Sequence, residues 1–542
     1  MNFNYLIYML FPISWRKKLV RGRLRGFTFL KKERKLNMWR LLKYEFLRSE
    51  VTNINGSTLL NKAFFQSAYP EARLIVQQYC ADKFLRPWLG GQILTYVGAP
   101  KNKLIWPLNS AWLKVLSENK ILYHSIFNRI LWASAICIIF LSHIYNSLIV
   151  LYKVFPALKF KAKIKDFKKT VYFYGLSINN TIGADKNFNI ISWYIREYKN
   201  KKDVYGLGHG VISVPNVTID KIAVKFKTLP FESRQKFYPY IRLFLWFIFF
   251  IIVCTIDLLR FHWERPLLFL EAMKLKIFEL SKKEDLCDEY FFHWSGGFYR
   301  PMWTYAIEKK GSKAILYFYS LSEQPKMYDS NPDLKFELYL LNWNNYLFWD
   351  EQHKEYHSKS ILNNVNGIVT GPIWFADNND YVSKKVGKYI SVFCIEYFRK
   401  AFYIGSSSLV EYFEYNEGVL NKFLEDIDYC CKIIHINMAH KRKRPQGRRE
   451  SKGYLRKIVE LTDSGTYFPI ASEISPTKLI NGSVGVISFP FTSVAIIAAN
   501  QNKPSIYYDP TGKLDINDIA SHNIPIIAGR ENLLIWMQGL KL

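Results

Sequence analysis

The chain has 542 residues, of which 49% are hydrophobic and 17% aromatic, and a formal net charge of +30. Composition of this kind excludes a disordered protein, because so many apolar residues can bury the cores of roughly two to four domains. The seven cysteines include no Cys-x-x-Cys pair, so we expect a reducing compartment, with neither a disulfide framework nor a structural zinc site. The charge indicates an anionic partner, which can be nucleic acid, an acidic membrane surface or a phosphorylated substrate.

The N-terminal segment is apolar over residues 5–13 and densely basic over residues 16–35. A secretory signal has the opposite order, with its charges before the apolar core. Leucine and aromatic residues alternate with lysine and arginine, which is typical of a segment lying on an anionic bilayer. A solvated basic arm on a soluble domain is the alternative.

Two uncharged apolar stretches follow, at residues 130–152 and 243–256. The first has about the 20 residues that a spanning helix needs, and the second is shorter. The lysines that follow the first stretch and the basic N-terminus both favour the cytoplasmic side, which conflicts with a single crossing. Three interpretations stay open: both stretches dock into one leaflet, both span, or both are core helices of a soluble domain.

After each apolar stretch, short runs of β-branched and aromatic residues alternate with helical segments such as residues 187–198. The predicted strands are residues 169–175, 203–205, 314–320, 337–341, 367–372, 388–395, 432–436, 484–489 and 504–509. Strands separated by helices predict parallel sheets with crossover helices, so we expect an α/β protein with two Rossmann-like domains. The predicted divisions are a basic membrane-associating region (1–128), an apolar helix with its basic flank (129–168), an N-terminal domain (169–380) with an apolar insertion (241–260), and a C-terminal domain (386–542).

The most informative segment surrounds Pro490-Phe-Thr-Ser493. A buried strand is predicted to end at Ser488, after which the chain turns and Thr492 or Ser493 can cap an alanine-rich helix. Ligands of open α/β sheets bind at the carboxyl ends of strands, and a helix start with two hydroxyls suits a phosphate. An ordinary N-cap on a crossover helix is the alternative.

In this setting, Pro490-Phe-Thr-Ser493 followed by Lys503-Pro-Ser-Ile-Tyr-Tyr-Asp509 resembles the signature of the bacterial surface-polysaccharide proteins named for their PFTS motif. Segments 183–193, 289–305 and 341–350 are also similar to that family, whereas residues 1–128 do not match it. The family is inferred to consist of glycosyltransferases with the two-domain GT-B character. The resemblance therefore implies a GT-B-like fold and a nucleotide-sugar donor.

A second basic cluster begins at His440, just after the strand predicted around His435. In GT-B enzymes a basic group at this strand end faces the donor phosphates; related sialyltransferase-like enzymes carry His-Pro where this chain has His440-Lys441. A solvated charge run is the alternative, and nucleic acid is disfavoured because no aromatic residue lies between His440 and Glu450. The donor-binding residues implied by the resemblance are His440, Lys441, Arg442, Ser488, Pro490, Phe491, Thr492 and Ser493.

An inverting transferase needs a general base for the acceptor hydroxyl, and Asp185 is the first candidate. His209 is the second, because the glycines of segment 206–210 would let a loop approach a ligand closely; Asp185 can alternatively cap the following helix. Asp426 and Asp428 stand two apart in a helical stretch and so point to different sides. We therefore expect no metal site, metal-independent transfer and no cofactor besides the nucleotide-sugar substrate.

These observations together predict a glycosyltransferase that acts in capsule or lipopolysaccharide synthesis. The expected partners are a nucleotide-sugar, a lipid-linked oligosaccharide acceptor and an anionic membrane surface, but no nucleic acid. A CMP-linked acidic sugar is one candidate donor, beside UDP- and GDP-sugars. The expected location is the cytoplasmic face of the bacterial inner membrane. The alternative function is a non-catalytic, membrane-peripheral scaffold of the polysaccharide assembly machinery.

Overall fold

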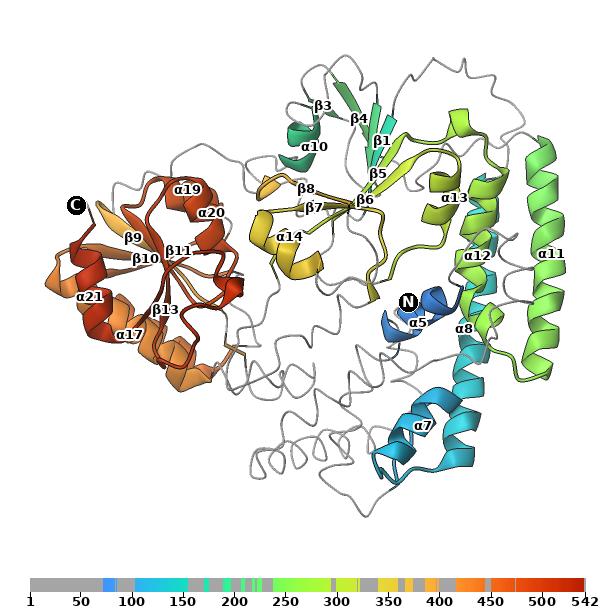
Figure 1. The fold of residues 1–542 in the computed structure, drawn as a ribbon, viewed down its shortest axis with the longest axis horizontal. Coiled ribbons are helices and arrows are strands. Elements are labelled where there is room, and N and C mark those ends of the chain that lie inside the picture. The colour runs from blue at the N-terminus through green and yellow to red at the C-terminus, as the bar shows by residue number, and fades with distance from the viewer. Residues whose placement is uncertain are drawn as a thin grey trace.

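The computed structural model describes two α/β domains and a group of long helices. Each domain is built around its own sheet, and the long helices lie on the side of the N-terminal domain that is remote from the C-terminal domain (Figure 1). The described residues are 72–82, 84, 103–154, 170–174, 189–195, 206–209, 217–219, 222–226, 237–293, 299–318, 320–321, 340–358, 366–373, 386–395, 397–398, 416–443, 450–472 and 474–540.

The N-terminal sheet has eight strands in the order β3-β4-β2-β1-β5-β6-β7-β8. All neighbours pair in parallel except β3, which forms an antiparallel hairpin with β4. Without β3 the order along the chain is 3-2-1-4-5-6-7, which contains the Rossmann order. The strands are β1 (Thr170–Tyr174), β2 (Gly206–His209), β3 (Val217–Ile219), β4 (Ile222–Phe226), β5 (Glu289–His293), β6 (Lys313–Tyr317), β7 (Asn345–Phe348) and β8 (Asn366–Val369).

The C-terminal sheet has six parallel strands in the order β11-β10-β9-β12-β13-β14, which is 3-2-1-4-5-6 along the chain. Its central strands are buried throughout, as expected where helices cover both faces of a parallel sheet. The two predicted Rossmann-like folds are thus confirmed. The strands are β9 (Tyr389–Phe393), β10 (Asn437–Lys441), β11 (Tyr467–Ile470), β12 (Gly485–Ser488), β13 (Ser505–Asp509) and β14 (Ile526–Ala528).

Short helices connect the strands of both domains. Those of the N-terminal domain are α10 (Asn189–Trp193), α13 (Trp303–Lys309), α14 (Glu351–Ser358) and the 3-10 turn η4 (Lys283–Asp285). Those of the C-terminal domain are α17 (Glu417–Ile433), α18 (Lys452–Thr462), α19 (Pro476–Asn481), α20 (Val494–Asn500), the 3-10 turn η7 (Ile519–Ser521) and α21 (Arg530–Gln538).

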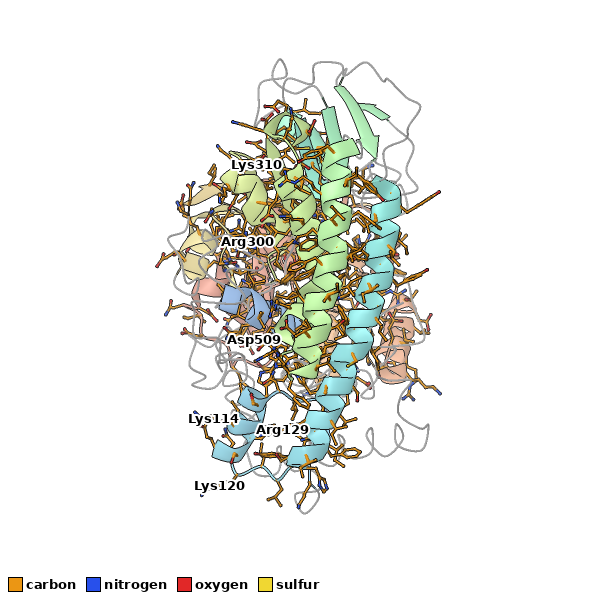
Figure 2. All side chains as sticks on the ribbon, turned by 90° about the vertical axis from the view of Figure 1, so that its right-hand side faces the viewer. Lys114, Lys120, Arg129, Arg300, Lys310 and Asp509 are labelled. Atoms are coloured by element: carbon orange, nitrogen blue, oxygen red, sulfur yellow. The ribbon has the colours of Figure 1, made fainter. Side chains whose placement is uncertain are left out.

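The two apolar stretches form the long helices α8 (Ser125–Val154) and α11 (Phe237–Leu259), which lie side by side (Figure 2). Both pack on α12 (Glu264–Leu280), which is connected to β5. The short helices α5 (Ala72–Cys80) and α7 (Ser110–Glu118) lie near them. By length and composition, α8 and α11 are the two helices of the described chain that could cross a membrane.

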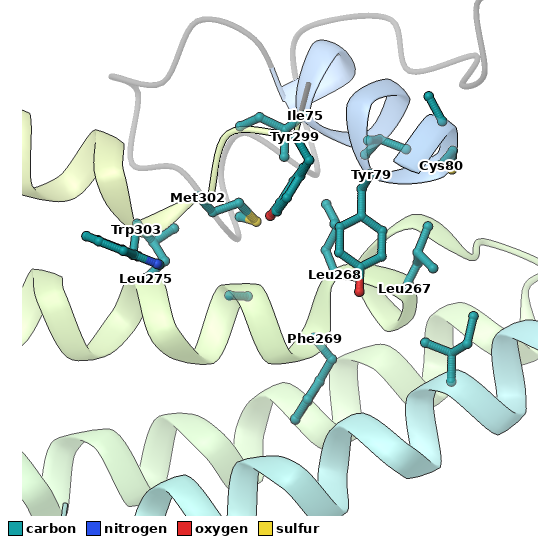
Figure 3. Packing of buried hydrophobic residues seen from close by; sticks show 14 of the residues in the cluster. Ile75, Tyr79, Cys80, Leu267, Leu268, Phe269, Leu275, Tyr299, Met302 and Trp303 are labelled. Atoms are coloured by element: carbon teal, nitrogen blue, oxygen red, sulfur yellow. The ribbon is translucent and has the colours of Figure 1, made fainter. Parts of the chain in front are cut away.

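A single hydrophobic cluster joins these helices to the N-terminal sheet. It contains residues of α5, α8, α11 and α12 together with residues of β1, β5 and β6. Leu267, Leu268 and Phe269 on α12 lie at its centre, opposite Tyr79 of α5 (Figure 3). Helix α12 is therefore part of the core of the N-terminal domain and also the support for α8 and α11.

Some predicted elements differ from the structure. The strand predicted at 432–436 is wrong, because α17 continues to Ile433 and the chain turns at His435, whose φ is 55°, before β10 begins. The apolar residues there form the last turn of α17 and the link to β10, where Ile433 is exposed and only Ile436 is fully buried. Segment 206–210 is mostly the strand β2 and not a loop, since pairing with β1 and β4 on both sides overrides the low strand preference of glycine. The strand predicted at 337–341 lies mainly outside the described residues.

Candidate functional site

The candidate site lies where the strand order of the C-terminal sheet reverses, between β9 and β12. In sheets of this order, ligands bind outside the carboxyl ends of the strands at that point. Strand β12 ends there with Ser488, and Phe489 donates its backbone N–H to the carbonyl of Phe393, the last residue of β9, at 2.8 Å. Cys394 follows β9, and Lys441 ends the neighbouring β10.

The segment after β12 makes a tight turn before α20. Phe491 has a φ of 55°, in the left-handed region that a bulky side chain rarely adopts. Its ring is buried and packs edge-on against Tyr507 at 5.3 Å, which holds the turn in place. Strain of this kind costs on the order of 1–3 kcal/mol and is concentrated at functional sites in proteins.

The hydroxyls of Thr492 and Ser493 do not cap a backbone N–H of the following helix, as the sequence predicted, but bind other groups. The Thr492 hydroxyl donates to the carbonyl of Phe489 at 2.9 Å and so closes the turn itself. Ser493 stands at the N-cap position of α20, but its hydroxyl caps no N–H of the helix. It accepts instead from the backbone N–H of Leu321, in the loop after β6, at 3.3 Å. Ser493 thus connects the motif to the N-terminal domain.

Ser488 is the one member of this segment whose hydroxyl is both buried and unsatisfied. Its side chain is 0% exposed, and its oxygen has no hydrogen-bond partner in the described part of the chain. Leaving such a group unpaired costs about 1–3 kcal/mol, so an unsatisfied hydroxyl in a native fold needs an explanation such as a ligand or an ordered water. Its position at the end of β12 is the position where a ligand would supply that partner.

His440 lies inside the domain and not in the solvated loop that its basic neighbours suggest. One ring nitrogen lies 2.6 Å from the Tyr467 hydroxyl, and the other lies 3.1 Å from the Cys394 sulfur, which in turn lies 3.2 Å from the Tyr454 hydroxyl. Burial, and then the nearby cations of Arg442 and Lys441, lower the pKa of His440 to about 3. The imidazole is therefore neutral at pH 7.

Lys441 and Arg442 have protein partners as well. The Lys441 ammonium donates to the carbonyl oxygens of Ser472 at 3.1 Å and Arg442 at 3.3 Å, neither of which carries a charge that could neutralise it. Arg442 lies 3.4 Å from a carboxylate oxygen of the buried Glu450. Both cations thus lie at the carboxyl end of β10. Strand β9 separates β10 from β12, the strand that precedes the motif.

The two candidate general bases belong to the N-terminal domain. His209 is the last residue of β2, at the carboxyl end of that strand, where only its backbone is described. Asp185 lies outside the described residues. The role proposed for either residue stays a prediction.

Loops of the two domains contact each other. Beside the Ser493 contact, Asp350, two residues after β7, lies 2.8 Å from the ring nitrogen Nδ1 of His522, which follows η7. Asp350 also accepts the backbone N–H of His353 at 2.7 Å, at the start of α14. The first contact joins the motif to the loop after β6, and the second joins the connection between β13 and β14 to the loop after β7.

The acidic residues that could suggest a metal have structural partners. Asp426 accepts from Tyr508 at 2.6 Å and Arg530 at 2.7 Å, whereas Asp428 accepts from Thr466 at 2.6 Å, so the two carboxylates face different neighbours as predicted. Asp509 accepts three backbone N–H groups of its own loop. Across the described ranges, no three His, Cys, Asp or Glu side chains are grouped as a metal site.

Comparison with solved structures gives distant likenesses. Trehalose-6-phosphate synthase OtsA is 12% identical and has a TM-score of 0.35, with 68% of this chain and 90% of that chain covered. UDP-GlcNAc 2-epimerase from Methanocaldococcus jannaschii is 11% identical and has a TM-score of 0.36, with 69% of this chain and 92% of that chain covered. Anabaena HepE in complex with UDP is 9% identical and has a TM-score of 0.36, with 68% of this chain and 89% of that chain covered. TM-scores below 0.5 are too low to carry an argument.

No curated protein matches the chain by sequence. The family model described as "Polysaccharide biosynthesis PFTS motif protein" matches residues 243–537. The match covers more than half of the chain and includes the strand, turn and helix around Pro490-Phe-Thr-Ser493 as well as α11, α12 and the C-terminal sheet. The chain therefore belongs to the polysaccharide biosynthesis PFTS motif family.

Proposed function

We propose that this protein is a glycosyltransferase that moves a sugar from a nucleotide-activated donor to a lipid-linked glycan in bacterial surface-polysaccharide synthesis. The observation that carries the proposal is the buried, unpartnered Ser488 hydroxyl at the switch point of a Rossmann-ordered sheet, directly before the family's motif. The proposed location is the cytoplasmic face of the inner membrane. The transfer needs no metal and no cofactor beyond the donor, of which a CMP-linked acidic sugar is the first to test.

In the proposed reaction the acceptor hydroxyl attacks the anomeric carbon of the donor sugar. A carbon–oxygen bond forms, the bond from that carbon to the phosphate oxygen breaks, and its electron pair leaves with the nucleotide. Asp185 or His209 takes the proton of the hydroxyl. Ser488 and the backbone at the start of α20 bind the phosphate, and Lys441 with Arg442 stabilises its developing charge from fixed positions.

One observation favours the alternative, a non-catalytic scaffold of the assembly machinery. A neutral, buried His440 cannot neutralise a phosphate at pH 7, and Arg442 already faces the Glu450 carboxylate. The Lys441 ammonium in turn binds the carbonyl oxygens of Ser472 and Arg442. A scaffold with a residual nucleotide-sugar fold needs no more than this.

Donor binding is tested first with the purified protein. A ligand that binds the native state raises the thermal midpoint by mass action, so CMP-, UDP- and GDP-sugars are compared in thermal-shift assays. We expect one nucleotide class to raise the midpoint of the wild-type protein and to raise that of Ser488→Ala less. No shift with any of the three classes contradicts the proposal.

Turnover is tested in cells that make the polysaccharide. We expect Thr492→Ala combined with Ser493→Ala to abolish the glycan product while the protein stays at the membrane. Ser464→Ala combined with Thr466→Ala is the matched control, because these two hydroxyls bind Asp428 beside β11, at the opposite end of the same sheet's strands. Unchanged product in the motif variant favours the scaffold and overturns the enzyme.

A further inference from the structure

Helices α8 and α11 together present an apolar surface that no other described part of the chain covers. The two lie side by side, and α12 lies behind both (Figure 2). Their outward side chains recur every three or four residues, so each helix exposes one continuous stripe. We call this the α8–α11 surface, and its large exposed members are Ile126, Phe127, Ile130, Leu141, Tyr145, Leu148, Ile149, Tyr152, Tyr238, Ile241, Phe244, Leu245, Ile248, Phe249, Ile252, Ile256 and Leu259.

The charges of the α8–α11 surface are all positive and stand at its ends. Arg129 and Lys153 are exposed near the two ends of α8, and Arg242 and Arg260 have the same places relative to α11. Helix α8 has no acidic residue, and the one acid of α11, Asp257, is buried in an ion pair with Arg265. The surface is thus apolar along its middle and cationic at both ends, with no exposed acid on either helix.

Charge complementarity selects the occupant of this surface. A second copy of the chain would set cations against cations, whichever way the two surfaces were paired. An anionic bilayer offers hydrocarbon to the middle of the surface and acidic headgroups to both of its ends at once. It is also the partner on which basic residues at both ends of one helix cause no conflict, whereas a spanning helix favours them on one side.

Helix α12 decides how such a bilayer can be oriented. The lengths of α8 and α11 do not decide between an upright and an in-plane orientation. Their basic residues lie about 36 Å apart along α8 and about 27 Å apart along α11, and both distances are close to the ~30 Å thickness of a hydrocarbon core. If α8 and α11 stood upright, α12 would lie at the same depth with its Glu271–Lys274 and Lys276–Glu279 ion pairs. The N-terminal sheet would follow, although non-helical backbone is not tolerated against lipid.

We propose that α8 and α11 lie in the plane of one leaflet of an anionic membrane, with the α8–α11 surface buried in that leaflet and neither helix crossing it. This seating deepens the membrane location in the proposed function and rests on it, but it requires no catalytic activity. The N-terminal sheet and the whole C-terminal domain stay on the same side of the membrane as the ends of both helices.

The first test is flotation of the purified full-length protein with lipid vesicles. We expect it to float with vesicles containing 30% phosphatidylglycerol at least tenfold more than with pure phosphatidylcholine, and Phe249→Asp combined with Leu245→Asp to abolish flotation. These side chains are 61% and 60% exposed, so the change leaves the fold intact. Val459→Asp is the matched control, since Val459 is also 61% exposed but lies on α18 in the other domain.

The second test separates in-plane seating from spanning by cysteine accessibility in bacterial membranes. Cys137 is the exposed cysteine of the chain and lies on α8, so Cys137→Ser is the background. Arg129→Cys and Lys153→Cys report the two ends of α8, and Leu141→Cys reports the middle of its exposed stripe. Each is treated with a membrane-impermeant maleimide in spheroplasts and in inverted membrane vesicles.

In-plane seating predicts that both end positions react in inverted vesicles only, and that Leu141→Cys is protected in both preparations. Reaction of one end in spheroplasts and the other in inverted vesicles shows a spanning helix and overturns the proposal. A dimer that does not float with any vesicle, and loses its association in the aspartate variant, shows that a second copy covers the surface and also overturns it. Neither test uses a sugar donor, so failure here is distinct from failure of the proposed transferase activity.

Discussion

The two sheets of this protein share one strand order but differ in the connection that follows the third parallel strand. Between β11 and β12, the C-terminal domain has the six-residue helix α19, whereas between β4 and β5 the N-terminal domain has α11 and α12. The same topological step is a short crossover in the domain with the candidate donor site and an apolar helix pair in the other. The proposed donor site and the proposed membrane-seated helix α11 thus belong to different domains, although the strand order around them is the same.

The largest effect on stability is expected from removing the aromatic ring of α12 that packs against both α8 and α11. Phe269 of α12 is fully buried and contacts Phe140 of α8 at 5.3 Å and Phe250 of α11 at 5.1 Å. Phe269→Ala should lower the free energy of unfolding by about 3–5 kcal/mol, as measured by urea denaturation. Phe249→Ala, on the exposed side of α11, should change it by less than about 0.5 kcal/mol. Equal losses would mean that α11 is not packed as described.

Acid should destabilise both domains through one histidine of lowered pKa in each. Burial lowers the pKa of His440 to about 3 and that of His293 to about 4, from an ordinary value of 6.5. Below pH 6.5 the unfolded chain binds protons that the folded chain refuses, so stability is lost as the pH falls from 6.5 toward those values. Each histidine contributes a slope of up to ~1.4 kcal/mol per pH unit.

The slope is assigned by substitution. Urea denaturation at pH 7, 6, 5 and 4 should show a shallower loss for His440→Gln in the C-terminal transition and for His293→Gln in the N-terminal one. If the wild-type slope persists in both variants, the histidines are not held neutral by burial. A slope change in the wrong domain would contradict the separation of the two units.

A smaller effect is expected at the contact between the domains. Hydrogen bonds to charged groups contribute about 1.5–3 kcal/mol, and the Asp350–His522 pair joins the loop after β7 to the connection between β13 and β14 at 2.8 Å. The coupling energy is measured with Asp350→Asn, His522→Gln and the double variant, which removes the separate effect of Asp350 on α14. A coupling energy near zero would show that the pair does not hold the domains together.

The smallest effect on stability, and the most informative, is expected at Ser488. Removing a buried hydroxyl that has no partner should leave the free energy of unfolding unchanged or raise it by up to ~1 kcal/mol. The same Ser488→Ala change should weaken donor binding about tenfold, measured by calorimetry with the nucleotide that gave the thermal shift, as loss of a hydrogen bond to a charged phosphate does. A clear loss of stability without any change in binding would make Ser488 a structural residue.

Much of the fold could be predicted from the sequence because its strands are buried on both faces. Runs such as residues 388–395 and 504–509 are rich in β-branched and aromatic residues, and the structure has β9 and β13 there. The prediction at 432–436 was wrong because three isoleucines recur there in the last turn of α17 and the link to β10, and local sequence cannot tell such a run from a short strand. Strand β2 was assigned to a loop because its two glycines are strand-forming only between neighbours that the local sequence does not reveal.

The candidate site could be predicted less completely. The strand and turn around Pro490-Phe-Thr-Ser493 are local features, and they were found. The neutral state of His440 was not, because its partners Tyr467 and Cys394 are 27 and 46 residues away and meet it only through the order of β9, β10 and β11. The basic residues that follow His440 indicate a solvated run, but His440 lies inside the sheet, and this burial keeps its imidazole neutral.

The shared role of α12 has a practical consequence for preparing the protein. Cutting out apolar helices is a common way to make a membrane-attached enzyme soluble, but here the same cluster of side chains fills the interior of the sheet domain. Deleting α8 or α11 would uncover Phe269, whose ring packs against Phe140 of α8 and against Phe247 and Phe250 of α11. A soluble version of this protein has to be obtained by replacing the outward residues of α8 and α11 with polar ones, while every helix stays in the chain.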